Sequence, residues 1–211
     1  MPKSALSKDE VKAMLVLVAD RIIENEPMLS EAERNLGDGD HGLGMQRGME
    51  VVKEKLNASE PASIDKVFMD TGMAMMSSMG GASGAIFGTL WRNGGKAIVG
   101  RESFDAQALA DLIKAGLEGV MARGGAKPGD KTMIDALHPA MLKAQEVSAL
   151  PLNEAIIPVA QAAADGRDAS KALIATMGRA KTLGEQSIGF PDAGACSVAV
   201  IFDAMREYVV A

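Results

Sequence analysis

Residues 36–45 read LGDGDHGLGM, and the rest of the chain can be interpreted outward from this segment. One glycine separates two carboxylates, Asp38 and Asp40, and further glycines stand on both sides. Side chains two residues apart do not share a helix face, so this pair belongs to a loop. Because glycine accepts positive φ angles, the loop can fold back and point both carboxylates at one place. Two negative charges held together need a cation, and oxygen ligands favour Mg²⁺ or Ca²⁺.

Two familiar ligand-binding patterns do not fit this segment. GDGDHG matches the dinucleotide pattern GxGxxG from Gly37, but the preceding SEAERNL is polar and does not predict the strand that this pattern requires. An EF-hand starting at Asp38 would need an oxygen ligand and then a glycine where the chain has Gly42 and Leu43. On this segment alone, a solvated glycine turn that caps the next helix is the alternative to a metal site.

The composition favours helices and excludes some classes of partner. Of 211 residues, 47% are hydrophobic but only 3% are aromatic, with 15 methionines, so we expect an aliphatic, methionine-rich core. The net charge of −6 and the absence of basic patches indicate no nucleic-acid partner. No signal peptide and no apolar run near the ~18 residues of a membrane span are present, which predicts a cytoplasmic protein without membrane contact. The single cysteine, Cys196, is expected to be a buried hydrophobe.

Capping signals and apolar periodicity predict about eight helices. Ser7 and Glu10 form a capping box before a helix over 11–24, Pro27 ends that helix, and residues 28–34 are expected to be a polar connection. Further helices are expected at about 45–56, 64–79, 85–98, 106–123, 133–149, 151–177 and 195–210. The chain therefore predicts an all-α bundle, or barrel, of antiparallel neighbours, with residues 1–211 as one domain.

Four glycine-containing loops separate these helices, at residues 33–44, 80–84, 124–133 and 178–194. Alternate loops of an up-and-down bundle lie at the same end, so these four should meet. The loop at 80–84 precedes a helix, where backbone N–H groups can bind an anion, although a tight turn would also use its glycines. The loop at 124–133 is a near match to a P-loop, but no strand precedes it. Together the loops predict a metal–nucleotide site at one end.

Four segments carry a resemblance that covers nearly the whole chain. They are GDGDHGLGM, TGMAMMSSMGGASG, RGGAKPGDKTMIDAL and GRAKTLGEQSIGFPDAGACS. In this order and at these separations they resemble the nucleotide-binding (L) subunits of dihydroxyacetone kinases of the bacterial phosphotransferase-system-dependent type. The resemblance implies a barrel of eight antiparallel helices with the nucleotide bound at one end.

The resemblance also implies site residues. Asp38 and Asp40 correspond to two of three carboxylates that hold a pair of Mg²⁺ ions, and Glu33 stands where the family usually has aspartate. Gly44 stands where the bacterial pattern often has asparagine. The residues implied to bind ADP or ATP are His41, Gly42, Leu43, Gly44, Ala82, Ser83, Gly124, Met133, Arg179, Asp192, Ala193 and Gly194. No catalytic side chain beyond the metal ligands is expected, because the chain offers no candidate base for a sugar hydroxyl.

The implied function is phosphoryl transfer within a complex. The chain would bind ADP and pass a phosphoryl group to dihydroxyacetone held covalently on a separate substrate subunit. A phosphocarrier subunit of the phosphotransferase system would rephosphorylate the ADP in place. Two alternatives stay open: an ATP-exchanging subunit of a dihydroxyacetone or erythrulose kinase, and a nucleotide-sensing partner of a transcriptional regulator.

Overall fold

The computed structural model describes residues 3–58 and 60–211. Within these ranges the chain forms nine α-helices and two 3₁₀ helices, and its only extended pairing is an isolated bridge between Leu6 and Phe104. In chain order the elements are α1 (Lys8–Glu24), α2 (Glu26–Arg34), α3 (His41–Ala58), α4 (Ile64–Ser78), α5 (Gly81–Ala97), α6 (Ala106–Gly124), α7 (Ile134–Glu146), α8 (Leu152–Ala169), η1 (Ser170–Ala172), η2 (Ala180–Ser187) and α9 (Ala193–Val210).

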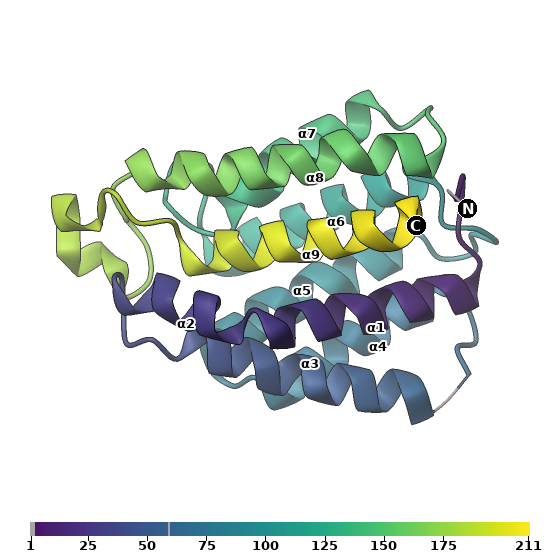
Figure 1. Ribbon diagram of the computed structural model, residues 1–211, viewed down its shortest axis with the longest axis horizontal. Helices are drawn as coiled ribbons and strands as arrows, with labels where there is room; N and C mark the ends of the chain where they lie inside the picture. Colours follow the sequence, from purple (N-terminus) through teal and green to yellow (C-terminus); the bar gives the residue numbers. More distant parts are fainter. Residues whose placement is uncertain (1–2, 59) are drawn as a thin grey trace.

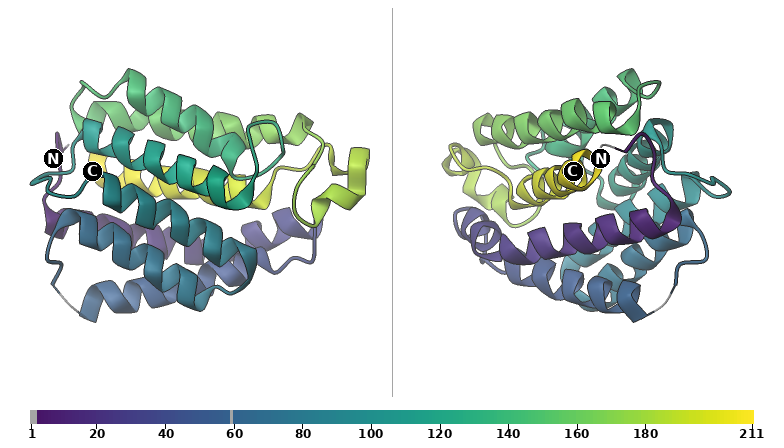
Figure 2. Two further views of the ribbon diagram at one scale, coloured as in Figure 1. Left: turned by 180° about the vertical axis from the view of Figure 1, so that it is seen from behind. Right: turned by 45° about the vertical axis from the view of Figure 1, so that its right-hand side comes forward.

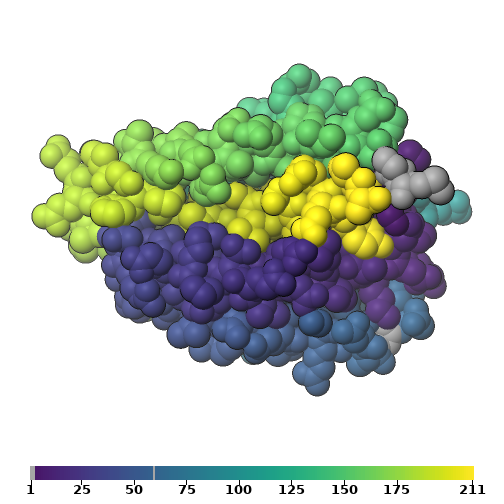
Figure 3. Space-filling model, in the orientation of Figure 1, coloured from purple at the N-terminus to yellow at the C-terminus, as the bar shows by residue number. Residues whose placement is uncertain are grey.

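Eight of the helices close a ring. Helix α1 packs on α3, each later helix packs on the next along the chain, and α9 returns to pack on α1. Neighbouring helices run in opposite directions, and the start of α1 and the end of α9 lie at the same end of the barrel (Figures 1 and 2). The space-filling view shows α9 between α1 and α8 (Figure 3). The prediction of an all-α barrel of about eight antiparallel helices is confirmed.

Helix α2 lies where the sequence predicted a polar connection. Pro27 occupies its first turn, where a backbone N–H has no helical partner and proline's missing donor costs little. Pro27 therefore begins a second helix as well as following the first. Helix α2 packs on α3 and α9 and carries Glu33 to the edge of the acidic loop.

Two helices are shorter than predicted. Helix α7 ends at Glu146 instead of near 149, and α8 ends at Ala169 instead of near 177. The Ser170 hydroxyl donates to the carbonyl of Arg167 at 2.6 Å and so satisfies a carbonyl that the helix end leaves free. Pro158 lies inside α8 and not in its first turn as expected, so it removes one helical hydrogen bond.

The core is built from aliphatic side chains, methionines and few rings, as predicted. Phe68 stacks on Trp91 with ring centroids 5.9 Å apart. Cys196 is buried and its thiol is free, and burial raises its pKa to about 11. None of the described helices combines the length and hydropathy that crossing a bilayer requires. Among the residues that the structure describes, five methionines are at most 1% exposed: Met14, Met45, Met49, Met75 and Met205.

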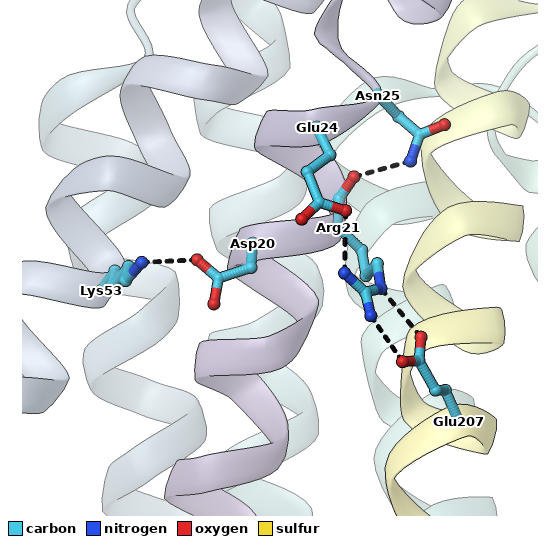
Figure 4. A network of polar contacts seen from close by, with 6 residues as sticks. All are labelled: Asp20, Arg21, Glu24, Asn25, Lys53 and Glu207. Carbon is cyan, nitrogen blue, oxygen red and sulfur yellow. Dashed lines mark hydrogen bonds and ion pairs between the residues drawn. The ribbon is translucent and has the colours of Figure 1, made fainter.

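Polar contacts fix α1 to both of its ring neighbours (Figure 4). The Arg21 guanidinium donates two hydrogen bonds to the carboxylate of Glu207 on α9, at 2.8 and 2.5 Å. On the other side, Lys53 of α3 donates to Asp20 at 2.5 Å. Because such surface pairs contribute below about 1 kcal/mol each, they orient the helices more than they stabilise the fold.

Candidate functional site

A cavity of about 500 Å³ opens at the end of the barrel where the four predicted loops meet. Its walls come from the α2–α3, α4–α5, α6–α7 and α8–α9 connections, which lie at the left of Figure 1. This volume is within the range of small-molecule sites. One part of the wall is apolar, formed by Ile86, Phe87, Met133 and Met177, and another part carries charged groups.

Three carboxylates gather at the charged side. Glu33, Asp38 and Asp40 each place one oxygen within 4.8 Å of the others. Gly39, with φ of 77°, lets the chain reverse between the two aspartates. Three negative charges this close repel one another unless a cation lies between them, and carboxylate oxygens are the ligands of hard divalent ions.

The first turn of α5 forms the neighbouring wall. Gly80 and Gly81 adopt φ angles of 72° and 61°, and no side chain caps the first N–H groups of this helix. Ala82 and Ser83 line the cavity at this point. Unpaired N–H groups and the positive end of the helix dipole favour an anion here.

The start of α3 is fixed by its own neighbours. The Glu33 carboxylate accepts the backbone N–H of His41 at 2.5 Å. The buried imidazole of His41 shares a hydrogen bond of 2.8 Å between Nε2 and the Ser197 hydroxyl of α9. Burial lowers the pKa of His41 to about 4, so the ring is neutral near pH 7. His41 therefore joins α3 to α9 and does not supply a charge.

Cations and one titratable acid stand on the remaining wall. The guanidinium of Arg179 forms an ion pair with Asp38. The buried ammonium group of Lys131 and the exposed Arg47 also line the cavity. Asp192 caps α9 by accepting the N–H of Ala195 at 2.8 Å. Burial raises the pKa of Asp192 to about 7, although the charge of Lys131 opposes this shift.

The structure brings most of the predicted site residues together. Asp38 belongs to the carboxylate cluster. Glu33 and Asp40 line the cavity, together with His41, Gly44, Ala82, Ser83, Met133, Arg179, Asp192, Ala193 and Gly194.

Three predicted contacts are not part of the cavity wall. A Cβ on Gly42 would lie 2.4 Å from the Ser30 hydroxyl, so this glycine serves the packing of α3 on α2. Leu43 is half exposed outside the cavity. Gly124 ends α6 and is not among the residues that line the cavity. A Cβ on Gly124 would lie 3.2 Å from Cδ1 of Ile86, whose side chain forms the wall at this point.

Sequence reasoning missed several wall residues. Arg47 is seven positions after Asp40 and three after Gly44, so helical spacing places it on the same face of α3. Lys131 and Thr132 lie in the loop at 124–133, whose sequence nearly matches a P-loop. Neither residue was predicted to line the site. Phe87 has no local signal beyond its place on the buried face of α5.

An all-helical barrel with clustered carboxylates and an uncapped helix start defines a class of protein suited to bind a metal ion and an anion at one end. A family comparison makes the assignment specific: the DAK2 domain matches residues 35–207. The chain belongs to the DAK2 domain family.

Curated relatives agree with the resemblance found in the sequence. The ADP-binding subunit of PEP-dependent dihydroxyacetone kinase 1 of Listeria innocua is 43% identical over 188 residues, covering 89% of this chain and 90% of the relative. The ADP-binding subunit of the PTS-dependent dihydroxyacetone kinase of Lactococcus lactis is 37% identical over 191 residues, covering 90% and 92%. These relatives confirm the predicted likeness to subunits of a kinase.

A solved structure shares the fold. The dihydroxyacetone kinase of C. freundii in complex with AMP-PNP and Mg²⁺ aligns with a TM-score of 0.74 at 25% identity. The alignment covers 98% of this chain and 34% of that one, so the present chain spans about a third of that kinase.

Proposed function

We propose that this chain is the nucleotide-binding subunit of a dihydroxyacetone kinase complex and that residues 1–211 act as one unit. One observation carries the proposal: a cluster of three carboxylates, two of which line the cavity, shares this cavity with the uncapped start of α5. This arrangement suits the phosphate groups of a metal-bound nucleotide. The relatives named as ADP-binding subunits and the neighbour solved with AMP-PNP and Mg²⁺ support the same ligand.

The residues present fit Mg²⁺. Glu33, Asp38 and Asp40 supply only oxygen ligands, and each carboxylate has more lone pairs than its contacts within the protein use. We infer that they hold two Mg²⁺ ions. When bound, such ions neutralise the charge that develops on transferring phosphoryl oxygens.

The chain's own groups position the nucleotide. The N–H groups at Ala82 and Ser83 would hold phosphate oxygens, and the apolar wall with Met133 would cover the base. Arg179 is ion-paired with Asp38 and would meet the phosphates beside the carboxylate cluster. The imidazole that lines the cavity, His41, is neutral and bound to Ser197. We therefore place the group that handles the acceptor hydroxyl on a separate substrate subunit.

The phosphoryl source follows from the same proposal. The proposed donor is a phosphocarrier of the phosphotransferase system, which is supported by the relatives described as PEP-dependent and PTS-dependent. ADP would then stay bound and be rephosphorylated in place, and dihydroxyacetone would be held covalently on the partner subunit. An ATP-exchanging subunit is the alternative.

The test begins with the chain purified without added nucleotide. One sample is denatured directly and a second sample is treated with EDTA first. Chromatography measures the nucleotides that remain bound in each until denaturation. Stoichiometric ADP that only EDTA removes would support a permanent Mg-ADP cofactor, whereas an empty protein that binds Mg-ATP reversibly would support the exchanging type. No nucleotide under any condition would refute the proposed function.

A further inference from the structure

The segment 170–190 lines the cavity beside the carboxylate cluster, where Arg179 pairs with Asp38. It follows α8, carries Met177, Gly178 and Arg179 to the cavity, and returns to α9. It projects beyond the helix ends at the left of Figure 1. Because this segment contains only 3₁₀ turns, its place depends on its contacts with neighbouring parts of the chain.

Both ends of the segment meet one side chain. The Lys131 ammonium group donates to the carbonyl of Ser170 at 2.6 Å and to the carbonyl of Phe190 at 2.7 Å. These residues are 39 and 59 positions from Lys131 in the sequence. A single nitrogen thus bridges the two ends of the segment, which the Gly189 N–H and the Lys171 carbonyl also join at 2.7 Å, and fixes both ends to the α6–α7 loop.

A neighbouring contact also holds the segment against the α6–α7 loop. The Thr176 hydroxyl donates to the Asp130 carboxylate at 2.7 Å, and the Thr176 N–H donates to the Asp130 carbonyl at 3.3 Å. Asp130 and Lys131 are adjacent, so one short stretch of the α6–α7 loop holds the segment at three points along its length.

The lysine is kept at an energetic cost. Its side chain is 2% exposed, and burial lowers the pKa of its ammonium group. Its two hydrogen-bond acceptors are neutral carbonyls, while the nearby charges of Asp135 and Asp192 favour the charged form. Within the described residues it is also the one non-glycine with positive φ, at 59°. Strained backbone and buried charge persist where the surrounding structure requires them.

We propose that Lys131 is a positioning residue, whose ammonium group fixes both ends of segment 170–190 and thereby holds Arg179 against the carboxylate cluster. The inference rests on the proposed function in one respect, because it takes Mg-ADP as the ligand of the cavity. The affinity for Mg-ADP would then depend on Lys131 through Arg179.

The variants separate this role from a general effect on folding. Lys131→Met removes the charge and both hydrogen bonds at nearly constant length, and Lys131→Arg keeps a charged donor. Lys131→Gly relieves the positive φ while losing the ammonium group, so it tests the same contacts if Lys131→Met does not fold. Lys127→Met is the matched control, because Lys127 lies in the same loop with an exposed side chain. Arg179→Met and the double variant Lys131→Met/Arg179→Met complete a cycle.

Amide hydrogen exchange of the full chain without nucleotide gives the first readout. In Lys131→Met, we expect amides within 170–190 to exchange at least about tenfold faster, with α1 and α5 unchanged, because the loss of the contacts opens this segment locally. Lys127→Met should match the wild type and Lys131→Arg should restore much of the protection. Unchanged exchange in both Lys131→Met and Lys131→Gly would overturn the proposal.

Calorimetry with Mg-ADP gives the second readout. We expect Lys131→Met to bind about tenfold more weakly, and the double variant to bind no more weakly than Arg179→Met alone. If the affinity of the double variant falls by the product of the two single losses, Lys131 does not act through Arg179. Failure of the wild type to bind Mg-ADP would refute the proposed function, and hydrogen exchange would still decide whether Lys131 holds the segment.

Discussion

Glu33 and His41 are joined by a hydrogen bond of 2.5 Å, in which the Glu33 carboxylate accepts the His41 backbone N–H. The bond connects the last turn of α2 to the first turn of α3 across the acidic loop. The side chain proposed to hold a metal ion therefore also caps a helix. Capping and metal binding depend on different properties of the carboxylate, so substitutions can separate them.

We predict that Glu33→Gln separates the two roles. Glutamine keeps an oxygen that can accept the His41 N–H but loses the charge, so the free energy of unfolding without Mg²⁺ should change by less than about 0.5 kcal/mol. Glu33→Ala loses the acceptor and should cost about 1 kcal/mol. Both variants should bind Mg-ADP at least about tenfold more weakly. Urea unfolding and calorimetry measure these effects, and wild-type affinity in Glu33→Gln would remove Glu33 from the ligand set.

The aspartates of the acidic loop should affect binding without affecting the fold. Asp38 and Asp40 are exposed, so Asp38→Ala and Asp40→Ala should leave the helical circular dichroism signal intact. Each should abolish Mg²⁺-dependent retention of ADP, because the remaining carboxylates cannot complete the site. The control is Asp203→Ala, which removes an exposed carboxylate that pairs with Arg206 on α9. Retention of ADP in both loop variants would contradict the metal assignment.

Local signals made much of the fold predictable. The Ser7–Glu10 capping box forms the hydrogen bonds that its sequence pattern predicts, and Asp105 caps α6 by accepting the Ala108 N–H. Helix α2 was missed because Pro27 was interpreted as a stop, and because its few buried residues, such as Leu29 and Ala32, lie in a polar stretch. A nine-residue helix of this kind depends on packing against its neighbours more than on its own sequence.

The site was predictable only in part. The sequence shows which loops lie close together, but it does not show what each residue in those loops contacts. The meeting of the four loops follows from helix alternation, which the sequence shows. The role of Lys131 depends on contacts with Ser170 and Phe190 that no local pattern reveals. Glycines within one motif also serve different needs, since Gly42 permits close helix packing while Gly44 faces the cavity.

The two glycines provide a matched test of this difference. Gly42→Ala would place a methyl group 2.5 Å from the Glu26 carbonyl oxygen, so we expect a loss of about 1–3 kcal/mol in unfolding free energy. The nearest atom to a Cβ on Gly44 is 4.0 Å away, so Gly44→Ala should fold normally and gain up to about 1 kcal/mol from helix propensity. Thermal unfolding without nucleotide compares them, and equal stabilities would refute this account.

Asp192 should make stability depend on pH in an unusual direction. Its folded-state pKa is about 7, above the ordinary value of 3.8, because burial disfavours the charged form. Between these values the folded chain keeps a proton that the unfolded chain has released. The resulting stabilisation is complete below 3.8 and is lost as the pH rises through 7.

Asp192→Asn tests this dependence without removing the α9 cap, because asparagine also accepts an N–H at this position. Since asparagine does not ionise, the wild type should lose on the order of 2–4 kcal/mol of unfolding free energy relative to the variant between pH 4 and 7. Urea unfolding at several pH values in this range measures the difference. Asp168→Asn is the control, because Arg167 and Lys171 lower the pKa of Asp168 to about 2, so its contribution stays constant above pH 4. A constant difference between the wild type and Asp192→Asn would show that Asp192 is already ionised in the folded chain at pH 4.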